Sequence, residues 1–303
     1  MNKLIPLVTN FTSNIRLFVK VWIATFFILV IFTFLVKEQY QSEMILSPTE
    51  DSKGELQSMG SAGALASLAG IALETDVSRS TKAISKMRSK SFFIELIESY
   101  GDELLAGIVA ARSYNKSSDQ LSYRKSIYNS GIWYGDEEFN IFDEVFVDKA
   151  YEKYLKMLRI NENRLSGLIT VNFRHVSPNF SYRALSMILE QINESARMQD
   201  KTEAEYAINF LSTSFNEYGN EPLRKTAGIL AERQLKVIML ANSKKSYMLE
   251  ALDGPHVPVT RHFPSRTITV LVGEFLISVL LYLYLFYKES IFSFFREINA
   301  HSS

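Results

Sequence analysis

Two long apolar runs, one near each end of the chain, constrain its fold more than any other feature. The first covers residues 17–36 and contains one charged residue, Lys20, and the second covers residues 267–287 and contains only Glu274. A helix over the second run is about 31 Å long, which matches the hydrocarbon core of a bilayer. The first run is also long enough if Lys20 extends its charge to the interface. We therefore expect two transmembrane helices.

The residues that flank these runs predict an orientation. No small-residue cleavage site follows the first run, so we expect a retained anchor rather than a signal peptide. The bias of Lys and Arg towards residues 1–16 and 288–303 is mild, but a segment as large as 37–266 is translocated largely regardless of charge. We expect cytoplasmic tails at residues 1–16 and 288–303 and an extracytoplasmic segment at residues 37–266. The absence of cysteine fits an oxidising compartment. The net charge of zero gives no sign of nucleic-acid binding.

The extracytoplasmic segment contains three stretches with the pattern of β-strands. Apolar and polar residues alternate in "YQSEMILSP" (40–48) and in "GLITVNFRH" (167–175), and "SYMLEALD" (246–253) is a third candidate. The first strand follows one apolar run and the third precedes the other, so both should lie close to the bilayer. We expect these two strands to pair and to form a membrane-proximal α/β base.

A long helical hairpin is the second expected feature. Ser177 and Pro178 form a helix start, and residues 182–217 contain neither Gly nor Pro, which predicts a helix of about 54 Å. Its segment "RMQDKTEAE" is polar all round, so this part should leave the protomer's own core. A second helix returns after "YGNEP" (218–222). Between the first two strands we expect four shorter helices, at residues 61–73, 74–87, 91–99 and 147–159. We expect the stretch 113–146 to be mostly loop.

Three prolines precede the second apolar run, in "PHVPVTRHFPSRTITVLVGEFL". Proline fixes its own φ and favours extended geometry in the residue before it, so Pro255, Pro258 and Pro264 predict a stiff, mostly non-helical strut. The strut would hold the extracytoplasmic domain at a set height above the membrane. The alternative is an ordinary loop before a membrane helix.

These features together resemble a known family. The motifs are "YQSEMILSP", "GSAGALASLAGIAL", "SKSFFIELI", "GLITVNFRHVSPNFSYRALSMILEQINE", "LRKTAGILAERQLKVIMLA" and the closing proline strut. Their order and spacing are similar to those of Wzz-type chain-length determinants, also called polysaccharide co-polymerases, over nearly the whole chain. The fold class expected is an α+β membrane protein with two terminal transmembrane helices, a periplasmic domain with a membrane-proximal α/β base, and a long helical hairpin.

The resemblance also implies a location, partners and a function. It implies a homo-oligomer of the bacterial inner membrane, bell-shaped with protomers side by side, with most of the chain in the periplasm. Such an oligomer sets the modal length of a glycan made by a separate membrane polymerase, so its partners are that polymerase, lipid-linked glycan and the bilayer. The tail "KESIFSFFREINAHSS" has no Walker-type loop and no tyrosine cluster, so no fused kinase is expected. Whether the glycan is O-antigen, capsular or exported polysaccharide stays open.

No residue is assigned a catalytic role, and no metal or cofactor is expected. The four histidines are scattered without a metal-binding motif, and the acidic stretch "GDEEFNIFDEVFVD" has the pattern of a solvated face rather than of a glycosidase's two carboxylates. We therefore expect a non-enzymatic assembly scaffold. An adaptor of a capsular-polysaccharide ABC exporter is the main alternative, and a periplasmic glycan-acting enzyme is a weaker one.

The expected sites are structural, and they combine the proline strut with the second apolar run. Glu274 lies about 11 Å inside the outer boundary of this run, where an acid costs about 2.5–3.5 kcal/mol to insert, so it should face protein. If the outer ends of the two runs are level, Thr25 or Thr33 could satisfy its carboxyl, as could a neighbouring subunit or the polymerase. The alternative is a protonated acid facing lipid. Gly273 offers a small surface for helix packing, although no GxxxG motif is present.

Overall fold

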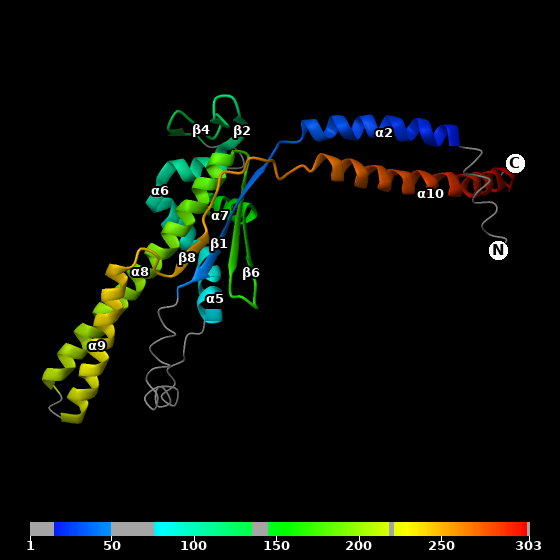
Figure 1. Ribbon diagram of the computed structural model, residues 1–303. Helices are drawn as coiled ribbons and strands as arrows, with labels where there is room; N and C mark the ends of the chain where they lie inside the picture. The colour runs from blue at the N-terminus through cyan, green and yellow to red at the C-terminus, as the bar shows by residue number, and fades with distance from the viewer. Residues whose placement is uncertain (1–14, 50–75, 135–144, 218–220, 302–303) are drawn as a thin grey trace. The chain divides into compact units, whose positions relative to one another are not determined.

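The computed structural model describes residues 15–49, 76–134, 145–217 and 221–301 (Figure 1). The chain divides into two compact units. One comprises residues 1–39 and 260–303, and the other comprises residues 40–259.

A four-stranded antiparallel sheet organises the larger unit, with strand order β6-β7-β1-β8 (Figure 1). The two central strands are the two with the clearest alternation in sequence, β1 (Tyr40–Pro48) and β7 (Ile169–His175). In β1 every second residue from Tyr40 to Pro48 is buried, which confirms the predicted inward face. In β7 the side chains of Ile169, Val171 and Phe173 are fully buried. Both strands therefore present one apolar face to a core.

The edges of the sheet are short strands. The strand β8 (Leu249–Asp253) pairs with β1, so the predicted pairing of the first and third strands is confirmed. The other edge is β6 (Leu158–Glu162), which was not predicted because it directly follows a helix with no Gly or Pro between them. The pairing of Tyr40 with His175 places the beginning of β1 beside the end of β7.

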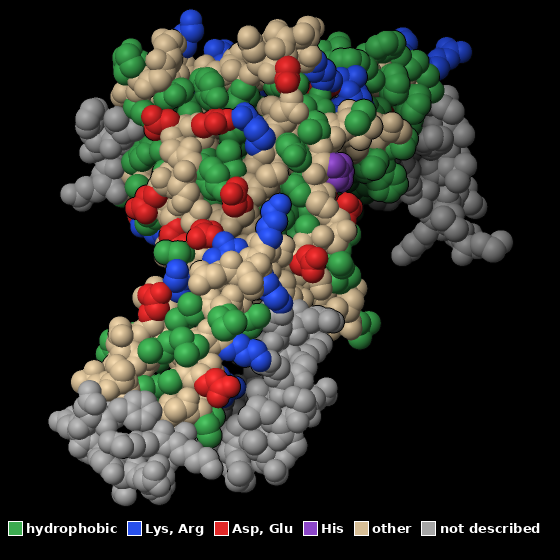
Figure 2. Space-filling view, turned by 60° about the vertical axis from the view of Figure 1, so that its left-hand side comes forward, with side chains coloured by type: hydrophobic (Ala, Val, Ile, Leu, Met, Phe, Trp, Pro, Cys, Tyr) green, Lys and Arg blue, Asp and Glu red, His purple; other side chains and the backbone are tan. Residues whose placement is uncertain are grey.

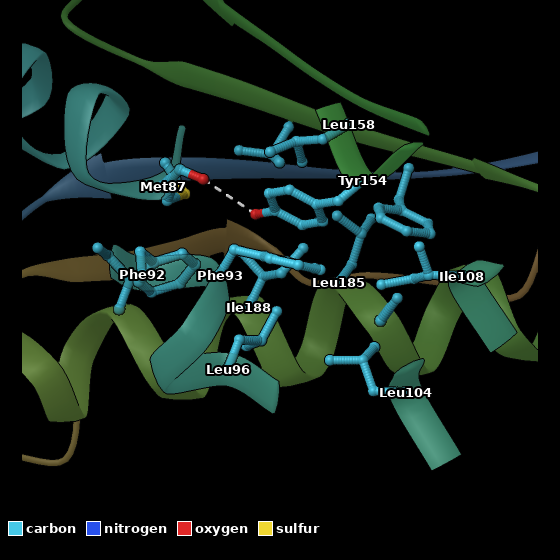
Figure 3. Close-up of a cluster of buried hydrophobic side chains, with 14 of the residues drawn as sticks. Met87, Phe92, Phe93, Leu96, Leu104, Ile108, Tyr154, Leu158, Leu185 and Ile188 are labelled. Carbon is cyan, nitrogen blue, oxygen red and sulfur yellow. Dashed lines mark hydrogen bonds between the residues drawn. The ribbon is translucent and has the colours of Figure 1, made fainter. Parts of the chain in front are cut away.

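Four helices build the core on this sheet: α5 (Asp76–Met87), α6 (Lys90–Ala110), α7 (Phe146–Met157) and the first part of α8 (Pro178–Glu217). Figure 3 shows how their aromatic and aliphatic side chains meet around Tyr154. The Tyr154 hydroxyl is buried there and donates a hydrogen bond to the carbonyl of Met87, 3.0 Å away. Side-chain caps start two of the helices, because Ser89 accepts from the backbone N–H of Phe92 and Ser177 accepts from that of Phe180.

The long hairpin is formed by α8 and α9 (Glu221–Ser243), which pack against each other. The prediction of one continuous helix up to Glu217 is confirmed. Buried residues recur along α8 as far as Ala196, and of the described residues from 197 to 213 only Ala204 is buried. The polar segment "RMQDKTEAE" therefore lies largely outside the hydrophobic core, as predicted.

Two predictions about the connecting segments were wrong. The stretch read as loop from residue 113 contains two small hairpins: β2 (Ala111–Asn115) with β3 (Gln120–Tyr123), and β4 (Tyr128–Asn129) with β5 (Ile132–Trp133). Packed aromatic rings stabilise these short strands; for example, the ring centres of Tyr128 and Trp133 lie 4.8 Å apart, with the rings tilted by 58°. The helix expected at residues 91–99 continues to Ala110, with non-helical geometry at Gly101, where φ is 62°. The expected helix at 61–73 and most of the acidic stretch lie outside the described residues.

The smaller unit consists mainly of two helices that pack against each other, α2 (Ile15–Leu35) and α10 (Arg266–His301). Among the described residues, one segment is long and apolar enough to cross a membrane, Phe18–Leu35, and 6% of it is buried. The second apolar run, residues 267–287, lies within α10. A backbone hydrogen bond from Gln39 to Phe263, 2.9 Å long, joins the chain just after α2 to the chain just before α10.

Candidate functional site

The proline-rich segment is non-helical from Gly254 to Ser265, as predicted. The side chains of Pro258 and Pro264 are buried and that of Pro255 is half-buried. In the larger unit the hydroxyl of Ser42 donates to the carbonyl of His256 at 2.6 Å, which fixes the segment to β1. The segment is thus non-helical and bound to β1, and its role as a strut remains a proposal.

Glu274 faces protein rather than lying open on the surface of its helix. Its exposed fraction is 6%, and the Thr25 hydroxyl donates to its Oε1 atom at 3.1 Å. Thr33, the other expected candidate, donates instead to the carbonyl of Val30 on its own helix. Of the two threonines expected at this depth, Thr25 is the partner.

Gly273 allows the two apolar helices to approach closely. A Cβ atom at this position would lie 2.8 Å from Cδ1 of Leu29, closer than non-bonded carbons pack. Nearer the beginning of α10, the guanidinium of Arg266 lies 3.9 Å from the ring centre of Phe34 and donates to Glu38 at 3.2 Å. The helix pair therefore combines close packing, a buried acid and a charged end.

The hairpin has a surface that its own protomer does not cover. Large hydrophobic side chains on both helices are strongly exposed, including Tyr206 (76%), Phe210 (64%) and Met239 (70%). Figure 2 shows hydrophobic side chains open to solvent on the hairpin, at the lower end of the molecule in that view. Exposed apolar side chains are typical of interaction surfaces when they form a contiguous patch. We name this set the hairpin surface: Met198, Tyr206, Phe210, Ile229, Leu235 and Met239.

The histidine and carboxylate side chains are the possible metal ligands of this chain. Within the described residues, no group of three or more His, Asp or Glu residues could hold a metal ion. His175 is buried, and its ring accepts from the N–H of Ser177 and lies 3.0 Å from the carbonyl of Gly107. Burial lowers the pKa of His175 to about 4, so the ring is neutral at pH 7 and helps to position the start of α8.

Sequence reasoning missed Asn193, which connects the hairpin to the sheet edge. This buried amide lies on α8 and makes five hydrogen bonds. Its Oδ1 atom accepts from the backbone N–H groups of Tyr247, Met248 and Leu249, and its Nδ2 atom donates to the carbonyls of Leu189 and Leu249. The available signal was a polar residue at an inward position of an otherwise apolar stripe.

Comparison with known proteins finds similar solved structures but no matching family model or curated sequence. Similar solved structures include a full-length bacterial polysaccharide co-polymerase, at 11% sequence identity and a TM-score of 0.39, covering 94% of this chain and 97% of that one. They also include a fragment of WzzB, the polysaccharide co-polymerase from Salmonella Typhimurium, at 12% identity and a TM-score of 0.31, covering 75% of this chain and 100% of the fragment. Both are polysaccharide co-polymerases, the family that the sequence motifs resemble.

Proposed function

We propose that this protein is a non-enzymatic homo-oligomer of the bacterial inner membrane that regulates the modal chain length of a surface polysaccharide of the O-antigen type. A separate membrane polymerase makes the glycan. The oligomer contacts the polymerase or the lipid-linked glycan, and the duration of this contact sets the length of the glycan. In this mechanism no residue makes or breaks a bond.

The hairpin surface is the observation that supports assembly. Exposure of aromatic side chains to water is unfavourable, and their burial against a neighbouring subunit would lower the free energy of the assembled state. A ring of protomers with hairpins side by side would bury these side chains. That the regulated polymer is a polysaccharide is inferred from the sequence resemblance and not from the geometry.

A two-pass topology follows from the same proposal. The tails at residues 1–16 and 288–303 lie in the cytoplasm, residues 17–36 and 267–287 cross the membrane, and residues 37–266 lie in the periplasm. The length and exposure of the apolar helix α2 support the first crossing. For the second crossing the support is the apolar sequence of residues 267–287. The segment with Pro255, Pro258 and Pro264 then holds the periplasmic unit at a set height.

A deletion strain tests the function. Removal of the gene should shorten the surface glycan and randomise its length without abolishing polymerisation, because the polymerase remains active. The measurement is the ladder of glycan lengths on a gel, with a plasmid-borne wild-type copy as the control. An unchanged ladder would contradict the proposal.

Complete loss of surface polymer would favour the main alternative, an adaptor of a capsular-polysaccharide ABC exporter. The two functions differ in their gene neighbours, which are a flippase and a polymerase in the first case and an ATPase and a permease in the second. A periplasmic glycan-acting enzyme is the weaker alternative. Incubation of the purified chain with lipid-linked oligosaccharide, followed by analysis of the sugar products, distinguishes it.

Glu274 provides a test inside the membrane. The change Glu274→Leu removes an acid that costs about 2.5–3.5 kcal/mol to insert, and it removes the acceptor of the Thr25 hydroxyl. Insertion should therefore be intact or improved, whereas oligomer stability or modal glycan length should change. Membrane fractionation measures the first property, and native gels and the glycan ladder measure the others.

Two variants control this experiment. Glu274→Gln keeps a carbonyl oxygen that can accept from Thr25, so it should lie closer to the wild type than Glu274→Leu does. Phe275→Leu alters an exposed neighbour on the same helix and should change none of the three measurements. A wild-type oligomer and ladder in Glu274→Leu would mean that the acid has no role in assembly.

A further inference from the structure

A pocket of about 590 Å³ lies in the larger unit between the β2–β3 hairpin and the beginning of α8. Its lining residues include Asp119, Gln120, Tyr123, Asn179, Tyr182 and Arg183. Pockets that bind small molecules typically have volumes of about 300–1,000 Å³, so this one can hold a short oligosaccharide.

The polar groups of the pocket are held in place before any ligand arrives. The Asn179 amide donates to both carboxylate oxygens of Asp119 at 2.6 Å, and the Tyr114 hydroxyl donates to one of them at 2.6 Å. The guanidinium of Arg183 forms an ion pair with Glu103. Side chains whose positions are fixed by such contacts lose little conformational entropy on binding.

The aromatic groups of the pocket supply flat apolar faces. The rings of Tyr123 and Tyr182 are half-buried, and Tyr123 packs edge-on against Tyr128 with ring centres 5.4 Å apart. The C–H faces of a pyranose ring pack on aromatic rings, whose faces carry negative charge density. The hydroxyl groups at the edge of the sugar donate to carboxylate oxygens and exchange hydrogen bonds with amides. Aromatic faces beside fixed carboxylate and amide groups therefore match a carbohydrate.

The pocket lies close to the points where the chain enters and leaves the larger unit. It lies at the end of the sheet where β1 begins, because Tyr114, which binds Asp119, also packs against Tyr40 with ring centres 6.3 Å apart. Val257 of the proline-rich segment lines it as well. Tyr40 follows α2 and Val257 precedes α10 in the chain, so both connections to the apolar helices leave the larger unit beside this pocket.

Another large cavity in this unit, of about 910 Å³, lies between α8 and the residues that follow α9. Tyr182 is the one aromatic residue among its described lining residues, and the charged residues Arg197, Lys244 and Lys245 line it. Of these two cavities, the pocket beside β3 is the one with two tyrosine rings, those of Tyr123 and Tyr182, among its described lining residues.

We propose that the pocket formed by Gln120, Tyr123, Asn179 and Tyr182 binds a short oligosaccharide segment of the growing glycan. This inference rests on the proposed function, from which we take the glycan as the ligand. It adds the site at which the glycan binds. The segment bound is the part of the glycan nearest to its lipid, because the chain's connections to the apolar helices lie beside the pocket.

Saturation-transfer NMR on the full chain in detergent tests the inference. The probe is the set of oligosaccharides released from the strain's own surface polysaccharide by mild acid. Wild-type protein should bind them, and Tyr182→Ala should weaken binding about tenfold because one stacking face is lost. Gln120→Ala should also weaken binding, and because Gln120 is exposed on the β3 edge this variant should not disturb folding. Tyr134→Ala, which removes an exposed tyrosine outside the pocket, should bind like the wild type.

The outcomes separate this inference from the proposed function. Absence of binding by the wild type, or equal binding by all four proteins, would overturn the pocket even if the deletion strain has a randomised ladder. If the deletion strain keeps its ladder but the purified chain binds oligosaccharide through Tyr182, the pocket stands and the length-control function fails. Weaker co-purification of the polymerase by Tyr182→Ala and Gln120→Ala, with unchanged oligosaccharide binding, would identify a protein-docking site and contradict the proposal.

Discussion

The change Phe210→Asp should dissociate the oligomer, with an increase of about 100-fold in the dissociation constant between protomers. Phe210 lies on the part of α8 beyond the core and is 64% exposed in the single chain. If a neighbouring hairpin covers it, the substitution removes the burial of an aromatic ring and places an unpaired charge at an apolar contact, and both effects oppose assembly. Mass photometry of the full chain in detergent measures the assembly state.

The fold of the protomer should survive this change, because no buried contact of the core depends on Phe210. Circular dichroism of the variant checks this point. Asn209→Asp introduces the same charge at the adjacent exposed residue without removing an apolar side chain, so it should assemble like the wild type. The glycan ladder of a Phe210→Asp strain should resemble that of the deletion strain. A stable oligomer in this variant would show that protomers do not meet through the hairpin surface.

The elements that could be predicted from the sequence are those whose pattern is local and long. β1 and β7 show a period of two over most of their lengths, and α8 contains no residue that breaks a helix between Tyr182 and Glu217. The depth of Glu274 narrowed its expected threonine partners to Thr25 and Thr33 but left a neighbouring subunit, the polymerase and lipid open, and the structure shows the contact with Thr25. For these strands and this helix, residue spacing along the chain was enough to predict the element.

The elements that were missed depend on contacts between distant residues. β4 and β5 have two residues each, so alternation cannot identify them, and packed rings such as Tyr128 and Trp133 stabilise them. The pocket joins residues 119–123 to residues 177–183 and to Val257, a combination that no spacing along the chain encodes. Prediction of the fold from the sequence was therefore better than prediction of the site.

Asn193→Leu should have the largest effect on stability. The amide of Asn193 holds three consecutive backbone N–H groups, those of Tyr247, Met248 and Leu249, where the chain enters β8. Leucine has a similar volume but accepts no hydrogen bond, so these donors lose their partner in a largely buried place. Each unsatisfied group costs about 1–3 kcal/mol, so three such groups give a loss of about 3–9 kcal/mol in the free energy of unfolding. At about 2–4 °C per kcal/mol for a unit of this size, the unfolding midpoint should fall by about 6–36 °C.

Thermal unfolding followed by the fluorescence of Trp133, in the larger unit, measures this effect in the full chain. Asn242→Leu is the matched control, since Asn242 is exposed near the end of α9, and it should shift the midpoint little. Asn193→Asp keeps the oxygen that accepts the three N–H groups and loses the two donated bonds, so it should destabilise less than leucine. Equal losses in the aspartate and leucine variants would show that packing at residue 193, rather than its three accepted hydrogen bonds, joins the hairpin to the edge of the sheet.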